Sequence, residues 1–173
     1  GGGHSEELLQ RLGEQGILYG IDRDPAALQA AGERLAGYPG FRPMHGNFHD
    51  VKELLEGVLL DGGLLDLGVS SHQLDTPDRG FSYHEDAPLD MRMDTTRGPT
   101  AAQWLNSVDE DVFAKALYDY ADERWAARIA KVLVEQRQLK PLRTTLDLVR
   151  VVDKAIPKAV RRKDAGPPAR RTF

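Results

Sequence analysis

The sequence predicts an α/β fold in which a doubly wound parallel sheet is followed by a small helical domain. Three observations support this prediction. Short apolar runs alternate with helical stripes over residues 1–75, glycine and proline become frequent from about Thr76, and further helical stripes fill the second half. Strands that alternate with helices are typical of parallel sheets with right-handed crossovers.

The first 75 residues are predicted to hold three strands separated by helices. The predicted elements are, in order, a helix over residues 5–15, a strand over 17–21, a helix over 24–37, a strand over 41–45, a short helix over 51–55 and a strand over 63–67. Asp24 followed by Pro25 is a typical helix start, because the aspartate caps free N–H groups and proline fits the first helical position. The apolar strands are suited to burial in a parallel sheet.

A long, functional loop is predicted from about Thr76, and three helices are predicted beyond it. The first helix begins at a capping box formed by Ser107 and Glu110, the second covers residues 122–136, and the third begins at Thr144 or Thr145 and ends before Pro157. The residues expected to face inward are Val112, Phe113, Ala116, Leu117, Tyr120, Trp125, Ile129, Val132, Leu133, Leu148, Val149, Val152 and Ile156. The last dozen residues are predicted to be disordered.

Composition excludes several classes of site. The chain has no cysteine, which excludes disulfides, thiolate metal sites and cysteine nucleophiles. It has no apolar run near the roughly 20 residues that a membrane span needs, and its start lacks the pattern of a signal peptide. We therefore expect a soluble, cytoplasmic protein with no membrane partner.

The charge is unevenly distributed along the chain. Residues 1–136 carry 12 Lys and Arg against 24 Asp and Glu, whereas residues 137–173 carry 11 against 3. The basic end could neutralise the phosphates of a nucleic acid, or it could be a solvated tail. Charge alone leaves both interpretations open.

Two features near the start indicate a nucleotide-type cofactor. A glycine run at residues 1–3 precedes a predicted helix, so a ligand can approach bare backbone and the helix N–H groups. Asp22 ends the next strand, where open α/β sheets bind ligands and an acid can accept both hydroxyls of a ribose. Two alternative interpretations are that the glycine run is the remnant of a tag and that Asp22 caps a helix.

Both a nicotinamide dinucleotide and S-adenosylmethionine suit this arrangement. The dinucleotide fingerprint needs a third glycine, and His4, Ser5 and Glu6 stand where it is expected. Glu6 and Glu7 at the start of the helix would repel a pyrophosphate but tolerate a sulfonium cation. The residues therefore favour S-adenosylmethionine.

A series of further segments resembles one family. The segments are DLGVSSHQLD at residues 66–75, RGFS at 79–82, LDMRMD at 89–94, GGGHS at 1–5, GIDRDP at 20–25, GNF at 46–48, RIA at 128–130 and RTF at 171–173. Together they resemble the MraW/RsmH family, the 16S ribosomal RNA cytosine N4-methyltransferases, along the whole chain. Mitochondrial relatives of that family are the nearest alternative.

The resemblance implies a fold, a cofactor and a set of binding residues. The fold would be a partial Rossmann-like S-adenosylmethionine-dependent methyltransferase domain with an inserted small helical domain. The implied cofactor-binding residues are Gly2, Gly3, His4, Asp22, Phe48, Asp66 and Gln73. Asp22 would hold the ribose hydroxyls, Phe48 would stack on adenine, and Asp66 with Gln73 would fix the methionine end. Without the family, Phe48 would be interpreted as a core aromatic and Gln73 as a surface group.

The reaction implied by the family needs a polar site around a weakly nucleophilic amine. Acceptors must orient the lone pair of the cytosine amine, and a proton must leave. Many amino-methyltransferases use a polar-Pro-Pro-aromatic motif here, which this sequence replaces with residues 66–71. We expect Asp66, as the candidate catalytic residue, and the turn at Ser70 and Ser71 to border the amine.

RNA contacts are expected in two places. The loop over residues 79–94 offers Phe81 and Tyr83 as stacking surfaces and Arg92 as a phosphate or base contact. Alternatively, Leu89, Met91 and Met93 dock this loop while Asp90, Arg92 and Asp94 are paired. The basic residues expected to form the main surface for 16S rRNA within the small ribosomal subunit are Arg161, Arg162 and Lys163.

The family pattern also predicts the domain organisation. Residues 1–75 would form the N-terminal part of the methyltransferase domain, 76–165 the loop and inserted helical domain, and 166–173 the return to the first domain. Family members have a strand before the glycine run and further strands after the last residues, so we expect a sheet without its central strand to leave backbone groups unpaired.

Alternative functions are a non-catalytic RNA-binding fragment and a nicotinamide-dependent dehydrogenase. We expect no metal site, because His45 and His49 lack a third ligand nearby. The oligomeric state stays open, with a homodimer as one alternative.

Overall fold

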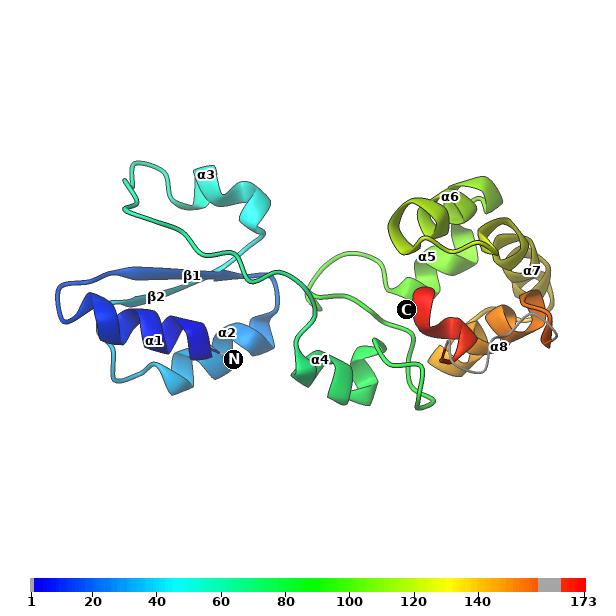
Figure 1. Ribbon diagram of the computed structural model, residues 1–173, viewed down its shortest axis with the longest axis horizontal. Helices are drawn as coiled ribbons and strands as arrows, with labels where there is room; N and C mark the ends of the chain where they lie inside the picture. Colours follow the sequence, from blue (N-terminus) through cyan, green and yellow to red (C-terminus); the bar gives the residue numbers. More distant parts are fainter. Residues whose placement is uncertain (1, 159–165) are drawn as a thin grey trace. The chain divides into compact units, whose positions relative to one another are not determined.

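The computed structural model describes residues 2–158 and 166–173, which form two compact units (Figure 1). The sheet unit comprises Gly1–Asp66 and Met93–Gly98, and the helical unit comprises Leu67–Arg92 and Pro99–Phe173. Over the residues described, no helix has both the length and the apolar character needed to cross a bilayer.

The sheet unit is built on a parallel pair of strands. Its elements are α1 (Gly3–Leu12), β1 (Leu18–Asp22), α2 (Pro25–Arg34), β2 (Phe41–His45), η1 (Phe48–Asp50) and α3 (Val51–Leu54). The strands pair in register from Leu18 opposite Phe41 to Asp22 opposite His45. The predicted α/β class with a parallel sheet is confirmed. The predicted N-cap is also confirmed, because the Asp24 side chain accepts a hydrogen bond from the amide of Ala26 at 3.0 Å.

The predicted strand over residues 63–67 is wrong, because no strand is found there. Leu64, Leu65 and Leu67 are more than half exposed. A strand forms only when its backbone groups pair with a neighbour, and within the described residues β1 and β2 pair only with each other. The predicted burial of this apolar run is therefore wrong as well.

Asp94 anchors the segment Met93–Gly98 to the sheet unit. Its side chain is 2% exposed and accepts hydrogen bonds from the Thr96 amide at 3.0 Å and the Arg97 Nε at 2.6 Å. His45, at the end of β2, has its Nε2 3.3 Å from the Asp94 Oδ2 atom that Arg97 also contacts. The hydrogen bonds from Thr96, then Arg97 and the nearby His45, hold the pKa of Asp94 well below its usual value of 3.8 despite the opposing effect of burial.

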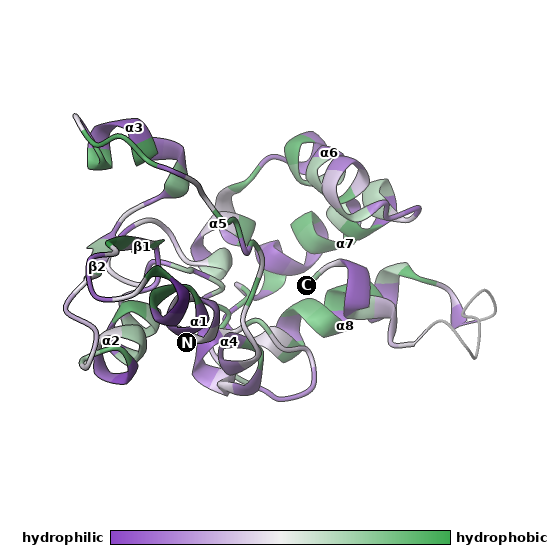
Figure 2. Cartoon of the chain, turned by 60° about the vertical axis from the view of Figure 1, so that its left-hand side comes forward, coloured by the Kyte–Doolittle hydropathy of each residue, from purple (hydrophilic) through white to green (hydrophobic). Residues whose placement is uncertain are grey.

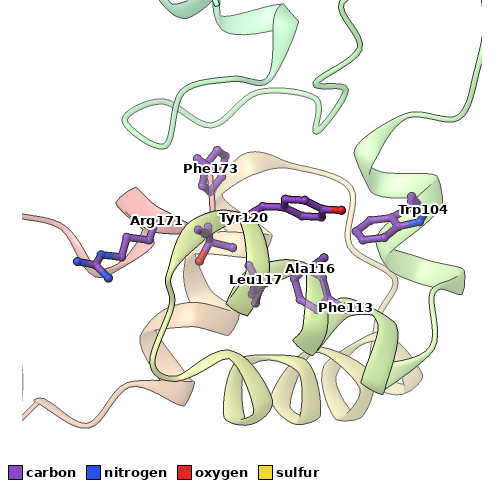
Figure 3. A pocket seen from close by; sticks show the side chains of 9 residues that line it. Trp104, Phe113, Ala116, Leu117, Tyr120, Arg171 and Phe173 are labelled. Carbon is purple, nitrogen blue, oxygen red and sulfur yellow. The ribbon is translucent and has the colours of Figure 1, made fainter. Parts of the chain in front are cut away.

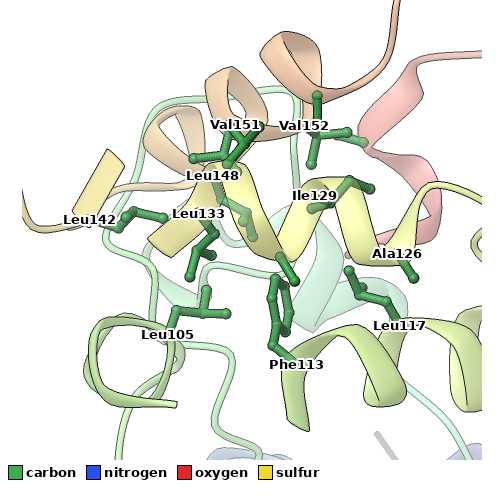
Figure 4. Close-up of a cluster of buried hydrophobic side chains, with 14 of the residues drawn as sticks. Leu105, Phe113, Leu117, Ala126, Ile129, Leu133, Leu142, Leu148, Val151 and Val152 are labelled. Atoms are coloured by element: carbon green, nitrogen blue, oxygen red, sulfur yellow. The ribbon is translucent and has the colours of Figure 1, made fainter. Parts of the chain in front are cut away.

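The helical unit contains a single cluster of buried apolar side chains. Its described elements are α4 (Ser71–Asp75), η2 (Pro77–Arg79), α5 (Ala101–Ser107), α6 (Glu110–Ala121), α7 (Ala126–Leu139), α8 (Thr145–Ala155) and η4 (Pro168–Arg171). Figure 2 shows hydrophobic and hydrophilic residues alternating along α7 and α8, as in amphipathic helices. Ile129, Leu133 and Val152 have no measurable exposure and form the centre of the cluster with Leu148 and Phe113 (Figure 4).

Several of the predictions for these helices need correction. Ser107 is the last residue of α5 and its hydroxyl donates to carbonyls within that helix, so it forms no capping box with Glu110. The helix α5 was missed, although Thr100 and Gln103 form the capping box that starts it. Tyr120 was predicted to face inward but is 90% exposed, because α6 presents only a narrow stripe to α7.

The same narrow stripe on α6 leaves Val112 exposed, whereas Phe113 and Leu117 are buried as predicted. The second helix begins at Ala126 rather than residue 122, because Asp122 adopts a left-handed conformation that ends α6. The third helix is confirmed, with Thr144 as its N-cap.

The predicted disorder at the end of the chain is wrong for residues 166–173. Pro168–Arg171 form a short helix in which Ala169 is 2% exposed. Phe173 packs against the apolar cluster and its ring lies 5.9 Å from that of Tyr83. Apolar contacts order this segment despite its basic composition. Arg161, Arg162 and Lys163 lie outside the described residues.

The loop before α5 is docked onto α8 through Thr145, which is fully buried. The Thr145 hydroxyl donates to the Glu85 carbonyl at 2.6 Å and accepts from the Ala87 amide at 3.1 Å. Leu89, 1% exposed, enters the apolar cluster beside this contact. The alternative in which Leu89 and Met91 dock the loop is therefore the arrangement observed.

We expect Thr145→Val to lower the free energy of unfolding by about 1–3 kcal/mol, because it leaves a buried amide and carbonyl without their partner. Urea unfolding followed by circular dichroism measures this change. The matched control is Thr95→Val, an exposed threonine, which should change stability little. Equal effects of the two substitutions would contradict the proposed importance of this contact.

We expect Asp94→Asn to destabilise the protein at pH 7, with the difference from the unsubstituted chain shrinking below about pH 4. The pKa of Asp94 is lower in the folded state than its usual value of 3.8, so its stabilising effect is present above that value and is lost as pH falls through the folded-state pKa. Unfolding curves at pH 7, 5 and 3 measure this. The exposed Asp61→Asn serves as control, and a pH-independent deficit for Asp94→Asn would show that charge is not the cause.

Candidate functional site

The carboxyl edge of the β1–β2 pair brings several predicted site residues to one end of the sheet unit. Asp22 and His45 are the last residues of their strands. Helix α1 runs opposite to β1, so its first turn lies at this same end (Figure 1). Ligands of open parallel sheets bind at this edge, because the loops that follow the strands converge there.

The glycine run forms the entrance to α1. Gly2 adopts a left-handed conformation, with φ of 80°, and a Cβ atom built on it would lie 3.4 Å from the Ala31 Cα. Glycine therefore suits both the backbone conformation and the close approach to α2. The first N–H groups of α1 have no partner within the helix and can bind a ligand's acceptor atoms.

The net negative charge at the start of α1 is smaller than the sequence suggested. Glu6 forms an ion pair with Arg34 at 2.7 Å, and Glu7 pairs with Arg11 at 2.8 Å. The expected repulsion of a pyrophosphate by these two carboxylates is weakened by their partners. The missing third glycine is the stronger argument against a dinucleotide.

Asp22 presents an exposed carboxylate at the strand end. Its Oδ1 accepts a hydrogen bond from the Asp24 amide at 2.9 Å, which orients the group. A carboxylate offers about four acceptor positions, so this bond leaves capacity for the two hydroxyls of a ribose. Asp24, and not Asp22, caps the following helix, which removes the cap interpretation of Asp22.

Phe48 lies just after β2 with its side chain 51% exposed. The Asn47 side chain accepts from the His49 amide at 3.1 Å and starts the short helix that carries Phe48. The interpretation of Phe48 as a core aromatic is therefore wrong. An aromatic ring exposed at a ligand-binding edge is suited to stacking on a planar base.

His4 and Asp66 form a pair that the sequence analysis did not predict. The distance from His4 Nδ1 to Asp66 Oδ2 is 3.0 Å, and the side chains are 73% and 72% exposed. The two residues are 62 positions apart, so no local spacing could have indicated the contact. The pair joins the start of α1 to the end of the segment that follows α3.

Gln73 belongs to the helical unit, where it is the third residue of α4 and forms a capping box with Ser70. Its Oε1 accepts from the Ser70 amide at 2.9 Å, and the Ser70 hydroxyl accepts from the Gln73 amide at 3.2 Å. At 4% exposure Gln73 is not the surface group considered as an alternative. Its predicted cofactor contact and the predicted role of the Ser70–Ser71 turn stay predictions.

Arg92 is engaged by Asp90 in a two-pronged ion pair. Its Nε lies 2.8 Å from Oδ1 and its Nη2 lies 2.7 Å from Oδ2. The hydrogen bonds from Arg92 lower the pKa of Asp90, against the opposing effect of burial. The paired alternative is thus observed for these two residues, and an RNA contact by Arg92 stays a prediction.

Metal-type ligands do not gather in the part of the chain that the structure describes: no group of three or more His, Cys, Asp or Glu side chains is suitably placed. His45 Nε2 instead lies 3.1 Å from the Arg23 carbonyl oxygen, beside Asp94.

An aromatic hollow on the helical unit was missed from the sequence. It has a volume of about 460 Å³, and Figure 3 shows the rings of Trp104, Tyr120 and Phe173 around it. The rings of Trp104 and Phe113 meet edge to face, with centroids 5.8 Å apart. Arg171 also lines the hollow, and its Nη1 donates to the Asp122 carbonyl oxygen at 2.5 Å and lies 3.8 Å from the Asp122 carboxylate. No sequence signal indicated this hollow, because the exposure of Trp104 and Tyr120 is apparent only from how α5 and α6 pack.

Comparison with known proteins places the chain in a family. The model of the MraW methylase family matches residues 1–173. Proteins named ribosomal RNA small subunit methyltransferase H are similar to the whole chain, at 49% identity in Clostridioides difficile (strain 630) and 49% in Symbiobacterium thermophilum. The relative of the same name in Trichlorobacter lovleyi is 50% identical, also over the whole chain.

The chain spans 57%, 55% and 56% of the lengths of these three relatives. The similarity covers both units, including the glycine run, both strands and the aromatic hollow. A family match along the complete sequence is stronger evidence than any single motif at the carboxyl edge. The chain therefore belongs to the MraW methylase family.

Proposed function

We propose that this chain provides the cofactor-binding edge and part of the RNA surface of an S-adenosylmethionine-dependent methyltransferase. Its substrate is the exocyclic N4 amine of a cytosine in 16S rRNA of the small ribosomal subunit. The observation that carries the proposal is the grouping of Asp22, Phe48 and the glycine run at one edge of the sheet unit, in a chain of the MraW methylase family.

The residues at this edge fit the parts of S-adenosylmethionine. Asp22 would accept the ribose hydroxyls, Phe48 would stack on adenine, and Gly2, Gly3 and His4 with Asp66 would border the methionine portion. Gln73, which belongs to the helical unit, stays a predicted cofactor contact. When bound, the cofactor supplies a methyl group activated by its sulfonium. Asp66 would then accept hydrogen bonds from the cytosine amine and orient its lone pair.

The helical unit suits RNA. A hollow lined by aromatic rings and an arginine offers stacking surfaces for an unpaired base and a cation for a phosphate. Arg161, Arg162 and Lys163, which lie outside the described residues, are proposed from the sequence alone as cations that neutralise phosphates. With 16S rRNA as the substrate, the activity would be in the cytoplasm. The alternative substrate for the same reaction is mitochondrial small-subunit rRNA.

The proposed organisation follows the family. Residues 1–75 would belong to a Rossmann-like methyltransferase domain, residues 76–165 to an inserted helical domain, and residues 166–173 to the return. A non-catalytic RNA-binding role is the second candidate, favoured by the hollow on the helical unit, which needs no cofactor.

We expect Phe48→Ala to weaken binding of S-adenosylmethionine about 5- to 150-fold, because a stacked base contributes roughly 1–3 kcal/mol. Calorimetric titration measures this in the 173-residue chain and in a version extended at both ends to the length of the relatives. Tyr118→Ala, an exposed aromatic on α6, is the matched control. Binding of NAD instead of S-adenosylmethionine would overturn the methyltransferase proposal, and RNA binding without either cofactor would favour the second candidate.

We expect Tyr120→Ala to weaken binding of a 16S rRNA fragment, about fivefold or more if one base stacks on the ring. Tyr120 lines the hollow and is 90% exposed, so the substitution should leave folding intact. Tyr118→Ala on the same helix, 68% exposed and outside the hollow, is the control in a filter-binding assay at fixed salt. An equal loss in both variants would remove the hollow from the proposed RNA surface.

A further inference from the structure

We propose that Arg124, Arg128 and Lys131 bind the phosphates of an unpaired RNA strand where that strand leaves the aromatic hollow. These three residues are called the α7 cation track. The inference rests on the proposed function and deepens it, because it specifies which form of RNA the helical unit binds. The observation behind it is a row of exposed cations without acidic partners that begins at the edge of the hollow.

The α7 cation track follows the outer side of one helix. Arg124 lies in the turn that leads into α7, and Arg128 and Lys131 follow at intervals of four and three residues. Residues at these intervals on a helix are neighbours on one face. All three residues are exposed, whereas Ile129 and Leu133 carry the opposite face of α7 into the apolar cluster. The cations therefore project into solvent as a row.

These cations lack the acidic partners that other cations of the helical unit have. Lys115 pairs with Asp119, and both Lys140 and Arg150 pair with Asp147. Within residues 2–158 and 166–173, no carboxylate pairs with a cation of the track. The chain has 27 acids against 23 Lys and Arg, so the absence of an acid beside three successive cations is unusual for this sequence. The track is therefore open to an anion from another molecule.

An aromatic ring supports one member of the track. The Arg128 Cζ lies 6.0 Å from the centre of the Trp125 ring. A guanidinium held over an aromatic face keeps its N–H donors, whose geometry matches the oxygens of a phosphate. The nearby acid Glu123 is withdrawn from the surface, since it is 5% exposed and its Oε1 accepts a hydrogen bond from the Trp125 amide at 2.9 Å. The first turn of α7 contains no acidic residue, so its surface is positive.

The track begins at the edge of the aromatic hollow. Ala121 and Arg171 line the hollow, and Figure 3 shows Arg171 at one side of it. Arg171 donates to the carbonyl oxygen of Asp122, the residue that ends α6 in a left-handed conformation. Arg124 follows Asp122 by two residues. A strand with one base stacked in the hollow can therefore place its next phosphates on the track.

This combination favours single-stranded RNA. Sites for unpaired strands join aromatic rings, which stack on bases, to cations that follow the backbone. A base inside a duplex is paired and stacked, so it cannot enter the hollow. The competing explanations are that the cations are merely solvated, as most surface charges are, or that they attract any polyanion, such as an acidic peptide. The aromatic rings beside the track favour RNA over a peptide.

The first test measures the salt dependence of RNA binding to the 173-residue chain. The probe is a cytidine-rich single strand of about 12 nucleotides, in filter binding at about 50 to 200 mM salt. We expect the combined variant Arg124→Gln, Arg128→Gln and Lys131→Gln to reduce the slope of log affinity against log salt by about 2, because each phosphate contact on a single strand contributes about 0.7. The fall in affinity over this range then becomes about 18-fold smaller.

The matched control is the combined variant Lys140→Gln, Arg143→Gln and Arg150→Gln, which removes the same charge from exposed positions around the start of α8. It should keep the slope of the unsubstituted chain. Tyr120→Ala should lower the affinity but keep the slope, because stacking releases no counterions. Circular dichroism checks that each variant is folded. Unchanged slope in the track variant, equal reductions in both triple variants, or no binding by the unsubstituted chain would overturn the proposal.

The second test identifies the partner. The competitors are the same strand annealed to its complement and a polyglutamate peptide of similar length. We expect the single strand to bind at least about fivefold more tightly than either, because only the single strand can stack a base in the hollow. Equal affinity for the duplex or for the peptide would contradict the proposal.

None of these measurements needs a methyl donor, so their failure is distinguishable from failure of the proposed function. If the extended version methylates no rRNA but the slopes differ as expected, the proposed function fails and the track stands as an RNA-binding surface. If the extended version methylates rRNA and the slopes are equal, the function stands and the track is removed.

Discussion

The parallel pairing of β1 with β2 is the interaction on which the candidate site depends. Five consecutive residue pairs fix the register and bring Asp22 and His45 to the same edge. A slip by one residue would reverse the side of every strand residue and separate these ends. The left-handed glycine before α1, the exposed Phe48 after β2 and the contact of Asp94 with His45 all take their positions from this pairing.

Polar contacts over long sequence distances fix each unit locally. In the sheet unit, Asp94 binds the end of β2, and His4 binds Asp66. In the helical unit, Thr145 holds the loop at Glu85 and Ala87 through a buried hydroxyl. Buried hydrogen bonds of this kind cost free energy when one partner is lost, so they specify the path of a loop more strictly than apolar contacts do.

The two units divide the proposed chemistry. The sheet unit holds the exposed acid, aromatic ring and glycine backbone that suit a nucleoside-containing cofactor. The helical unit has the larger apolar core and an aromatic hollow with a cationic rim, which suits a single-stranded nucleic acid. The proposed transfer of a methyl group to RNA would explain both features, and it agrees with membership of the MraW methylase family.

The sequence by itself determined the class of fold, the strand over residues 41–45, the cap at Asp24, a cap at Thr144 or Thr145, and the family, because hydrophobic period, capping chemistry and motifs are local properties. Only the tertiary structure decided that residues 63–67 form no strand, that Tyr120 is exposed and that His4 meets Asp66. Each of these depends on which distant segment is available as a partner. Pairing and burial depend on two segments that meet in space, so the local sequence of one segment cannot predict them.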